Sequence, residues 1–186
     1  MSYYSVVLFV HIVGALGFFV ALGVEWICLR RLRFAATAEQ VREWMRVATG
    51  VRRLGMAGML TLLASGIAMM VIAQLGGAWM IVAFWALVLL ALLAATLSFR
   101  RMAAIARAAS AEDGPLSPTL RRLLHHPLLW VAIQIRVAIA LGIVFLMTVK
   151  PELGGALLTI GVAVILGFAT ALPIRSAGRA HQEPAT

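Results

Sequence analysis

The stretch LFVHIVGALGFFVALGVEW, residues 8–26, decides the fold class because it is apolar throughout except for one histidine and one glutamate. About 20 consecutive apolar residues are needed to cross the hydrocarbon core of a bilayer as an α-helix. Across the whole chain, 63% of the residues are hydrophobic, 12% are charged, and the mean hydropathy is +1.00. A soluble domain of this size has a far more polar composition, so the sequence predicts an integral membrane protein.

Four further runs have the length and apolar composition of a membrane-spanning helix. The sequence lacks the period-two alternation of a membrane β-barrel, so helices are left to satisfy the backbone hydrogen bonds in lipid. We therefore expect an all-α, polytopic membrane helical bundle with a four-helix core and one additional helix. It forms a single transmembrane domain over residues 1–174, followed by a short cytoplasmic tail over 175–186. The predicted spans are Val6–Cys28, Leu54–Ile72, Trp79–Leu97, Leu128–Val149 and Leu153–Leu172.

The net charge of +9 is distributed unevenly between the predicted loops. Arginines fill the segments between spans one and two and between spans three and four, and two more follow span five. The opposite set of loops holds only Lys150 as a base. This asymmetry follows the positive-inside rule and predicts an external N-terminus and a cytoplasmic C-terminus. Topology thus explains the charge, which removes the reason to expect nucleic-acid binding. No basic residue precedes span one, so we expect it to be retained rather than cleaved as a signal peptide.

The two arginine-rich segments carry helix-start signals. In TAEQVREWMRV, residues 37–47, Thr37 and Gln40 have the spacing of a capping box, and apolar and basic residues follow at helical spacing. We expect an amphipathic helix that lies on, or feeds into, the inner leaflet. In the second segment, Ser117 and Pro118 follow a turn and predict the start of another short helix. Both segments also fit ordinary solvated or interfacial connectors.

Polar residues are costly inside a membrane, so each one in a predicted span is a candidate for function. His11 lies roughly 10 Å below the outer surface, from the helical rise per residue. Met69 and Met70 end span two at a similar depth, and Met80 and Met147 lie on the same side. Imidazole and thioether groups ligate haem iron and Cu(I), so His11 is the predicted metal ligand and Met69 or Met70 the predicted second ligand. The alternative is that the methionines fill gaps between helices and His11 hydrogen-bonds a neighbouring carbonyl group.

The other histidines and the cysteine do not extend this outer site. His125 and His126 begin span four, roughly 20 Å deeper than His11, so they cannot share a metal with it within one chain. A bis-histidine haem would need His11 from two subunits, or a partner protein. Cys28 is the only cysteine, which excludes an intrachain disulfide and a thiolate cluster.

Glu25 and Arg136 form a second polar layer in the inner half of the bundle. Glu25 lies about 6 Å and Arg136 about 12 Å from the cytoplasmic end, a difference that a long arginine side chain can span. An intramembrane ion pair between spans one and four is one interpretation. The others are a carboxylate proton relay and an arginine that receives an anionic group such as a haem propionate, which makes Arg136 a candidate cofactor-binding residue. Gln134, Thr61 and Ser65 are weaker candidates.

Four segments of the chain resemble a group of small bacterial membrane proteins: LFVHIVGALGFFVALGVEW, VRRLGMAGMLTLLASGIAMM, GGAWMIV and VFLMTVKP. The group includes the copper resistance protein D family, the membrane protoporphyrinogen oxidase of the haem pathway, and related families of unknown function. The resemblance covers roughly residues 4–151. In the oxidase branch, a first-helix histidine and a third-helix lysine matter for haem binding and activity. His11 matches the histidine, whereas span three has no lysine and carries Ala83 or Phe84 near that place.

Two further departures separate this chain from the oxidase branch: LLHHP replaces an acidic stretch before span four, and a fifth span is present. The resemblance thus implies a copper-resistance-like or uncharacterised relative. We expect a bacterial inner-membrane protein that binds haem or copper within the bundle, with a redox or metal-handling role. The competing expectation is a cofactor-free membrane subunit or a small-molecule or ion transporter, in which these polar residues pair helices or line a path. Enzyme activity, a homo-oligomer and a membrane partner protein are left open, while lipid is the expected surrounding.

Overall fold

The computed structural model describes residues 3–73 and 76–171, and every regular element in this part is helical. The predicted tail, residues 175–186, and the last residue of the fifth predicted span lie outside the described residues. Within them, five helices are long and apolar enough to cross a membrane, as the predicted all-α membrane bundle requires. The elements are α1 (Tyr3–Arg33), α2 (Ala38–Ala73), α3 (Ala78–Leu93), the π-helix η1 (Ala94–Phe99), α4 (Arg100–Ser110), α5 (Pro118–Leu124), α6 (Pro127–Val149) and α7 (Leu153–Ala171).

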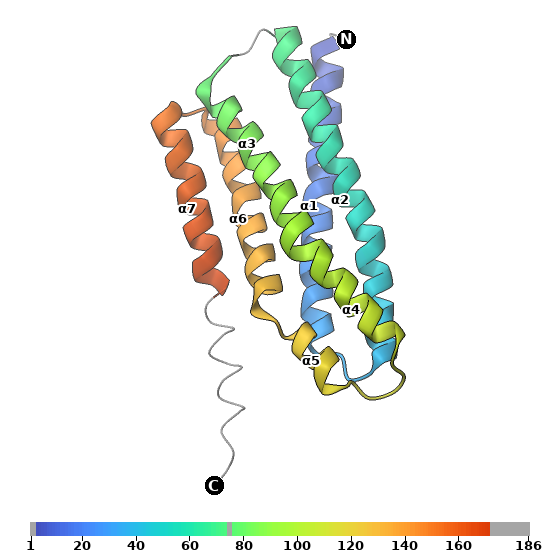
Figure 1. The fold of residues 1–186 in the computed structure, drawn as a ribbon. Coiled ribbons are helices and arrows are strands. Elements are labelled where there is room, and N and C mark those ends of the chain that lie inside the picture. Colours follow the sequence, from blue (N-terminus) through green and yellow to red (C-terminus); the bar gives the residue numbers. More distant parts are fainter. Residues whose placement is uncertain (1–2, 74–75, 172–186) are drawn as a thin grey trace.

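The first three spanning helices are longer than the sequence predicts. α2 has 36 residues, which at 1.5 Å per residue is roughly 54 Å, against about 30 Å for the hydrocarbon core. The third span does not end at Leu97, because α3 continues through η1 into α4 as one rod (Figure 1). These extensions carry the arginine-rich segments, so the long helices project beyond the apolar layer at one end of the molecule.

The predicted helix starts are present, with one difference in context. The Oγ1 atom of Thr37 accepts a hydrogen bond from the backbone N–H of Gln40 at 3.4 Å, and the Gln40 side chain accepts one from the N–H of Ala36 at 2.8 Å. The amphipathic segment is therefore the start of α2 itself and not a separate surface helix. Ser117 caps α5 by accepting from the N–H of Leu120, with a proline in the first turn.

The helices α1 and α2 pack as an antiparallel hairpin whose close approach depends on glycine (Figure 1). A Cβ atom on Gly58 would lie 2.9 Å from the backbone nitrogen of Phe18 and 3.0 Å from the carbonyl oxygen of Gly14. A Cβ atom on Gly14 would in turn lie 2.9 Å from Thr61. Small residues at these positions let the two backbones approach, as they do in other membrane helix pairs.

A second close pair holds α7 against α6 at the opposite edge of the bundle (Figure 1). A Cβ atom on Gly167 would lie 2.6 Å from the Cα atom of Ile135, and one on Gly142 would lie 3.2 Å from the Cβ atom of Ala163. Ala156 is fully buried in the same interface. Ile160 and Val164 are partly buried beside these small residues, whereas the other large apolar side chains of α7 are exposed, so the fifth helix joins the bundle along one side.

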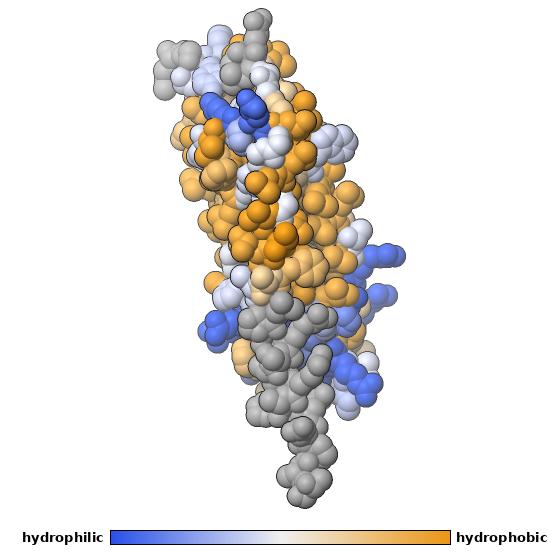
Figure 2. Space-filling view, turned by 90° about the vertical axis from the view of Figure 1, so that its left-hand side faces the viewer, coloured by the Kyte–Doolittle hydropathy of each residue, from blue (hydrophilic) through white to orange (hydrophobic). Residues whose placement is uncertain are grey.

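Apolar side chains cover the middle of the molecular surface. Figure 2 shows a broad hydrophobic band between hydrophilic ends. Phe9, Leu16, Trp85, Leu158 and Ile165 are each more than 59% exposed, from three different helices. Such a surface is stable in contact with lipid and not with water, so the fold is that of a multi-pass membrane protein.

The arginine-rich ends of the helices are tied together by Arg42 in α2. Its guanidinium donates to the carbonyl oxygens of Ala109 at 2.8 Å and Glu112 at 2.7 Å, and it forms ion pairs with Glu39 and Asp113. This set of bonds fixes the connection between α4 and α5 to the start of α2. As a result, α2 and α4 lie side by side beyond the apolar layer.

Candidate functional site

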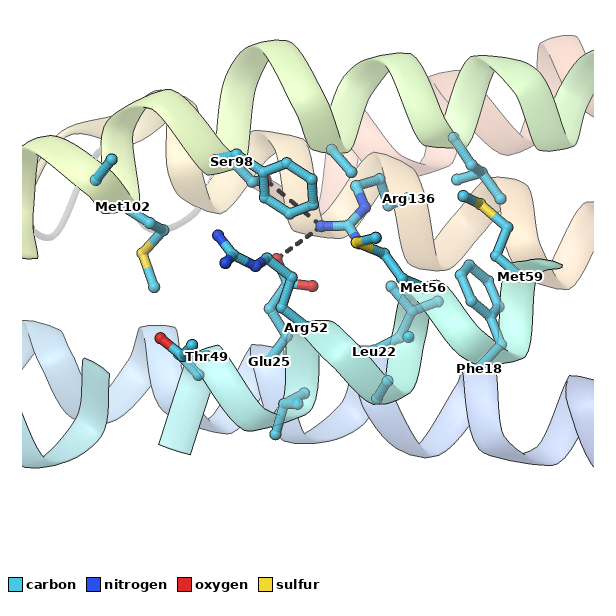
Figure 3. Close-up of a pocket in the computed structure, with 18 of the residues that line it drawn as sticks. Phe18, Leu22, Glu25, Thr49, Arg52, Met56, Met59, Ser98, Met102 and Arg136 are labelled. Carbon is cyan, nitrogen blue, oxygen red and sulfur yellow. Dashed lines mark hydrogen bonds and ion pairs between the residues drawn. The ribbon is translucent and has the colours of Figure 1, made fainter. Parts of the chain in front are cut away.

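A cavity of about 150 Å³ lies in the arginine-rich half of the bundle, among α1, α2, the α3–α4 rod and α6 (Figure 3). Most of its lining is apolar, and its polar groups are Glu25, Thr49, Arg52, Ser98 and Arg136. Four methionines also line it, namely Met45, Met56, Met59 and Met102. We call this space the inner cavity.

Arg136 is the most deeply buried charged residue of the inner cavity. Its side chain is 7% exposed, and its Nη1 atom lies 2.7 Å from Oε1 of Glu25, whose side chain is 20% exposed. The same Nη1 atom donates to Oγ of Ser98 at 3.4 Å, so three helices meet at this guanidinium (Figure 3). Within the described residues, the buried Nε–H of Arg136 has no hydrogen-bond partner. An unsatisfied donor of this kind is costly in a low-dielectric interior, which makes it a candidate contact for a bound molecule.

The π-helix η1 provides one wall of the inner cavity. Ala94, Ser98 and Phe99 from this wide turn all line it. Ser98 contacts the guanidinium of Arg136, while the ring of Phe99 lies under Arg52, with 5.2 Å between the guanidinium carbon and the ring centroid. Single π-turns inside α-helices occur frequently at functional sites. Here the wide turn contacts both arginines of the cavity.

The mouth of the inner cavity is on the side where α2 faces the α3–α4 rod. Arg52 and Met56 in α2 are exposed, as is Ala103 in α4, whereas Leu90 and Ala94 deeper in the cavity are buried. Arg52 lies two positions before Leu54, where the predicted apolar run starts. The mouth is therefore at the border between the apolar band and the arginine-rich end.

The predicted outer histidine has a defined hydrogen-bond partner. Nδ1 of His11 lies 2.9 Å from Oγ of Ser65, and that hydroxyl donates to the carbonyl oxygen of Thr61. A serine hydroxyl has one proton, so Ser65 must accept from His11, and in the neutral ring Nδ1 then carries the proton and Nε2 a lone pair. The ring also packs on Gly66, whose Cβ position would lie 3.6 Å from its Cε1 atom. The two weaker candidates Ser65 and Thr61 are thus the residues that orient His11.

The four predicted outer methionines do not share one environment. Met70 and Met147 are 40% and 38% exposed on the apolar surface, whereas Met80 is buried with 8% exposure. Met69 is half-buried, one helical turn from Ser65 on α2. Of these residues, Met69 has the position along α2 that is nearest to the contact of His11 with Ser65.

The structure separates the predicted cofactor-binding residues into two places. Arg136 contacts Glu25, which is fourteen positions from His11 on the same helix, a separation of about 21 Å. Arg136 therefore does not belong to one site with His11, Met69 and Met70. Over residues 3–73 and 76–171, there is no group of three or more histidine, cysteine, aspartate or glutamate side chains that could hold a metal ion.

The remaining polar candidates have structural contacts. His126 caps α6 by accepting from the N–H of Leu128 at 3.3 Å, and Nδ1 of His125 lies 2.9 Å from the carbonyl oxygen of Arg121. Gln134 accepts a hydrogen bond from the indole N–H of Trp26 at 3.0 Å. These side chains connect helix ends or neighbouring helices.

Sequence reasoning missed Arg52, Ser98 and the methionines of the inner cavity. Arg52 was one of many arginines in a connecting segment, and Ser98 is a small hydroxyl at the end of an apolar run. A sign was present in the spacing of Ala94, Ser98 and Met102, which share one helical face if the third span continues past Leu97. Without that continuation, the wall formed by α4 could not be foreseen.

Comparisons with known proteins add no relationship to these observations. No protein-family model matches the chain, and no curated protein or solved structure matches it. The class of protein is therefore defined by the fold and the site alone, as a multi-pass helical membrane protein with a mostly apolar cavity that contains an arginine–glutamate pair between its helices. The resemblance seen in the sequence stays a prediction.

Proposed function

We propose that this protein binds a small organic molecule in the inner cavity. We further propose that it lies in a bacterial inner membrane, with its arginine-rich end in the cytoplasm. The observation that carries the proposal is Arg136, which lines the cavity and whose buried Nε–H has no partner among the described residues. A ligand with a hydrogen-bond acceptor satisfies this donor. The positive-inside rule supports the orientation, because it would place the cavity mouth at the inner leaflet.

The size and lining of the inner cavity limit the ligand. A cavity of about 150 Å³ is the size that holds one benzene ring in an engineered protein core. The walls offer thioether and aromatic groups from Phe18, Met56, Met59 and Met102, which suit an apolar body. The ligand we propose therefore has a ring or a short apolar segment inside the cavity and an acceptor group that interacts with the arginines of the lining.

Haem does not fit the inner cavity. Ligand pockets for molecules of drug size begin at about 300 Å³, twice the volume of this cavity, and a haem is larger than most such molecules. The lining includes methionines but no histidine, and its charged groups are two guanidinium groups and one carboxylate. A copper ion in this cavity would be repelled by that excess positive charge.

One observation at the outer site, the contact between His11 and Ser65, supports a role in binding haem or copper. Ser65 fixes His11 with Nδ1 protonated, which directs the lone pair of Nε2 outward from that contact. Metal-binding histidines have this arrangement, in which the second ring nitrogen donates to a neighbouring group. His11 is thus the residue that would hold a haem or copper ion as a second candidate function, with Met69 as the nearest thioether along α2.

The inner-cavity proposal can be tested with a neutral ring-sized probe, 4-fluorobenzamide, by fluorine NMR on detergent-solubilised protein. We expect saturable line broadening with wild type that exceeds broadening by empty micelles. Ala103→Phe places a ring at the mouth from an exposed position and should abolish it, whereas Ala95→Phe, also exposed but outside the lining, should preserve it. Equal binding by the two variants would overturn the proposal, as would the absence of saturable broadening in wild type with both this probe and its carboxylate analogue 4-fluorobenzoate.

The outer-site candidate has its own measurement. Protein from a haem- and copper-replete host should show a Soret band in its reduced-minus-oxidised spectrum, or bound copper near one ion per chain, and His11→Ala should lose either signal. Native protein with neither signal refutes this role, and a His11→Ala variant that keeps its cofactor removes His11 from it.

A further inference from the structure

The charges of the inner cavity differ between its floor and its mouth. At the floor, the charge of Arg136 is balanced by Glu25 at 2.7 Å. At the mouth, Arg52 is exposed and its guanidinium lies over the ring of Phe99. In the part of the chain that the structure describes, Arg52 forms no ion pair with a carboxylate. The cavity therefore has one unbalanced positive charge, and it lies at the mouth.

A ligand that matches both ends carries one negative charge. A cation is repelled by Arg52, and a neutral molecule leaves that guanidinium without a partner. A dianion would bring a second charge that only Arg136 could balance, at the expense of its contact with Glu25. An organic monoanion needs neither change, because a carboxylate can pair with Arg52 and its apolar part can fill the space beside Met56 and Met59.

The position of the mouth also indicates where this anion comes from. Arg52 lies just before the apolar run of α2, and Met56 is 48% exposed on the same side. Amphiphilic anions in a bilayer hold their charged group at this border and their apolar chain inside. We infer that the natural ligand is a membrane-borne organic monoanion, a carboxylate on an apolar chain or ring, that reaches the inner cavity from the adjacent leaflet between α2 and the α3–α4 rod. This inference rests on the proposed small-molecule function.

The preference for an anion can be measured with two probes of nearly equal shape, 4-fluorobenzoate and 4-fluorobenzamide, in the same detergent. Wild type should bind the benzoate about tenfold more tightly, the effect of one partly exposed charge-assisted contact. Arg52→Gln should remove this difference. Arg53→Gln is the matched control, because Arg53 is exposed on the next position of α2 and does not line the cavity. It changes the net charge equally and should preserve the tenfold difference.

Competition experiments distinguish a membrane-borne ligand from a free anion. In nanodiscs, decanoate should displace 4-fluorobenzoate, whereas acetate and inorganic phosphate at the same concentration should not. Displacement by acetate as effective as by decanoate would overturn the membrane source. The anion preference would be overturned if wild type bound the two fluorinated probes equally, or if Arg52→Gln and Arg53→Gln reduced the affinity difference between them to the same extent. Binding of 4-fluorobenzamide would in that case still support the cavity as a binding site. Failure of both probes to bind would instead refute the small-molecule function.

Discussion

The ion pair between Glu25 and Arg136 should be a major source of stability, and Glu25→Gln tests it most directly. The substitution keeps the size of the side chain and one hydrogen-bond acceptor but leaves the guanidinium of Arg136, 7% exposed, without a counter-charge. Removing one member of a buried pair costs about 3–5 kcal/mol. The amide returns about 1 kcal/mol through its hydrogen bond. A net loss of about 3 kcal/mol corresponds to about 6–12 °C in unfolding temperature for a chain of this length.

The chain contains a convenient reporter for this measurement. Cys28 is the only cysteine, is fully buried, and lies three positions after Glu25 on α1. A thiol-reactive fluorophore can therefore label it only when the bundle opens near the ion pair. We expect labelling of Glu25→Gln in detergent to begin 6–12 °C, as an approximate range, below that of wild type. Glu43→Gln, which removes the same charge from an exposed position of α2, should label as wild type does.

A second variant separates the charge effect from a packing defect. Glu25→Gln combined with Arg136→Gln puts two amides in the place of the two charges and leaves no buried charge unpaired. This double variant should be more stable than Glu25→Gln alone, since the cost of the single change is mostly that of an unbalanced guanidinium. The reasoning is refuted if Glu25→Gln labels at the wild-type temperature, or if the double variant loses the sum of the two single effects.

Three further outcomes follow from close contacts of the described residues. Gly58→Ala should lower the labelling temperature of Cys28, because its Cβ atom would lie 2.9 Å from the backbone of α1 and overpacking costs about 1–3 kcal/mol. Gly167→Ala should expose α7 to limited proteolysis, because the new Cβ atom would lie 2.6 Å from the backbone of α6. Gly161→Ala is the control and should change neither the labelling temperature nor the proteolysis, because its Cβ atom would meet nothing within 4 Å. Arg42→Gln should accelerate proteolysis between α4 and α5, whereas Arg46→Gln at an exposed position should not.

The membrane spans were predictable because hydropathy is a property of consecutive residues. The last two helices, α6 and α7, begin at or next to the predicted residues. The first three helices were predicted too short, since a hydropathy window ends where arginines begin, whereas a helix ends only where its hydrogen bonds do. α2 continues through its polar part because the capping box at Thr37 starts the helix and no proline interrupts it before the membrane.

Part of the inner site was also predictable, because a charge within an apolar helix must find a partner. Depth along the helix placed Glu25 and Arg136 at similar levels, and they are in contact. The environment of the methionines was not predictable in this way, because a thioether side chain is stable both in contact with lipid and in a protein core. Depth alone therefore grouped Met69, Met70, Met80 and Met147, although Met70 and Met147 face outward. Which side of a helix is buried depends on its neighbours, and that information is not in one helix.

The wide turn η1 lies where the α3–α4 rod lines the inner cavity. A π-turn inserts an extra residue into the helix, so the side chains before and after it shift their angular positions relative to an unbroken α-helix. In the structure, Ser98 and Phe99 both face the cavity, one at Arg136 and one at Arg52. The wide turn therefore supplies both the contact of the rod with Arg136 at the floor and its contact with Arg52 at the mouth.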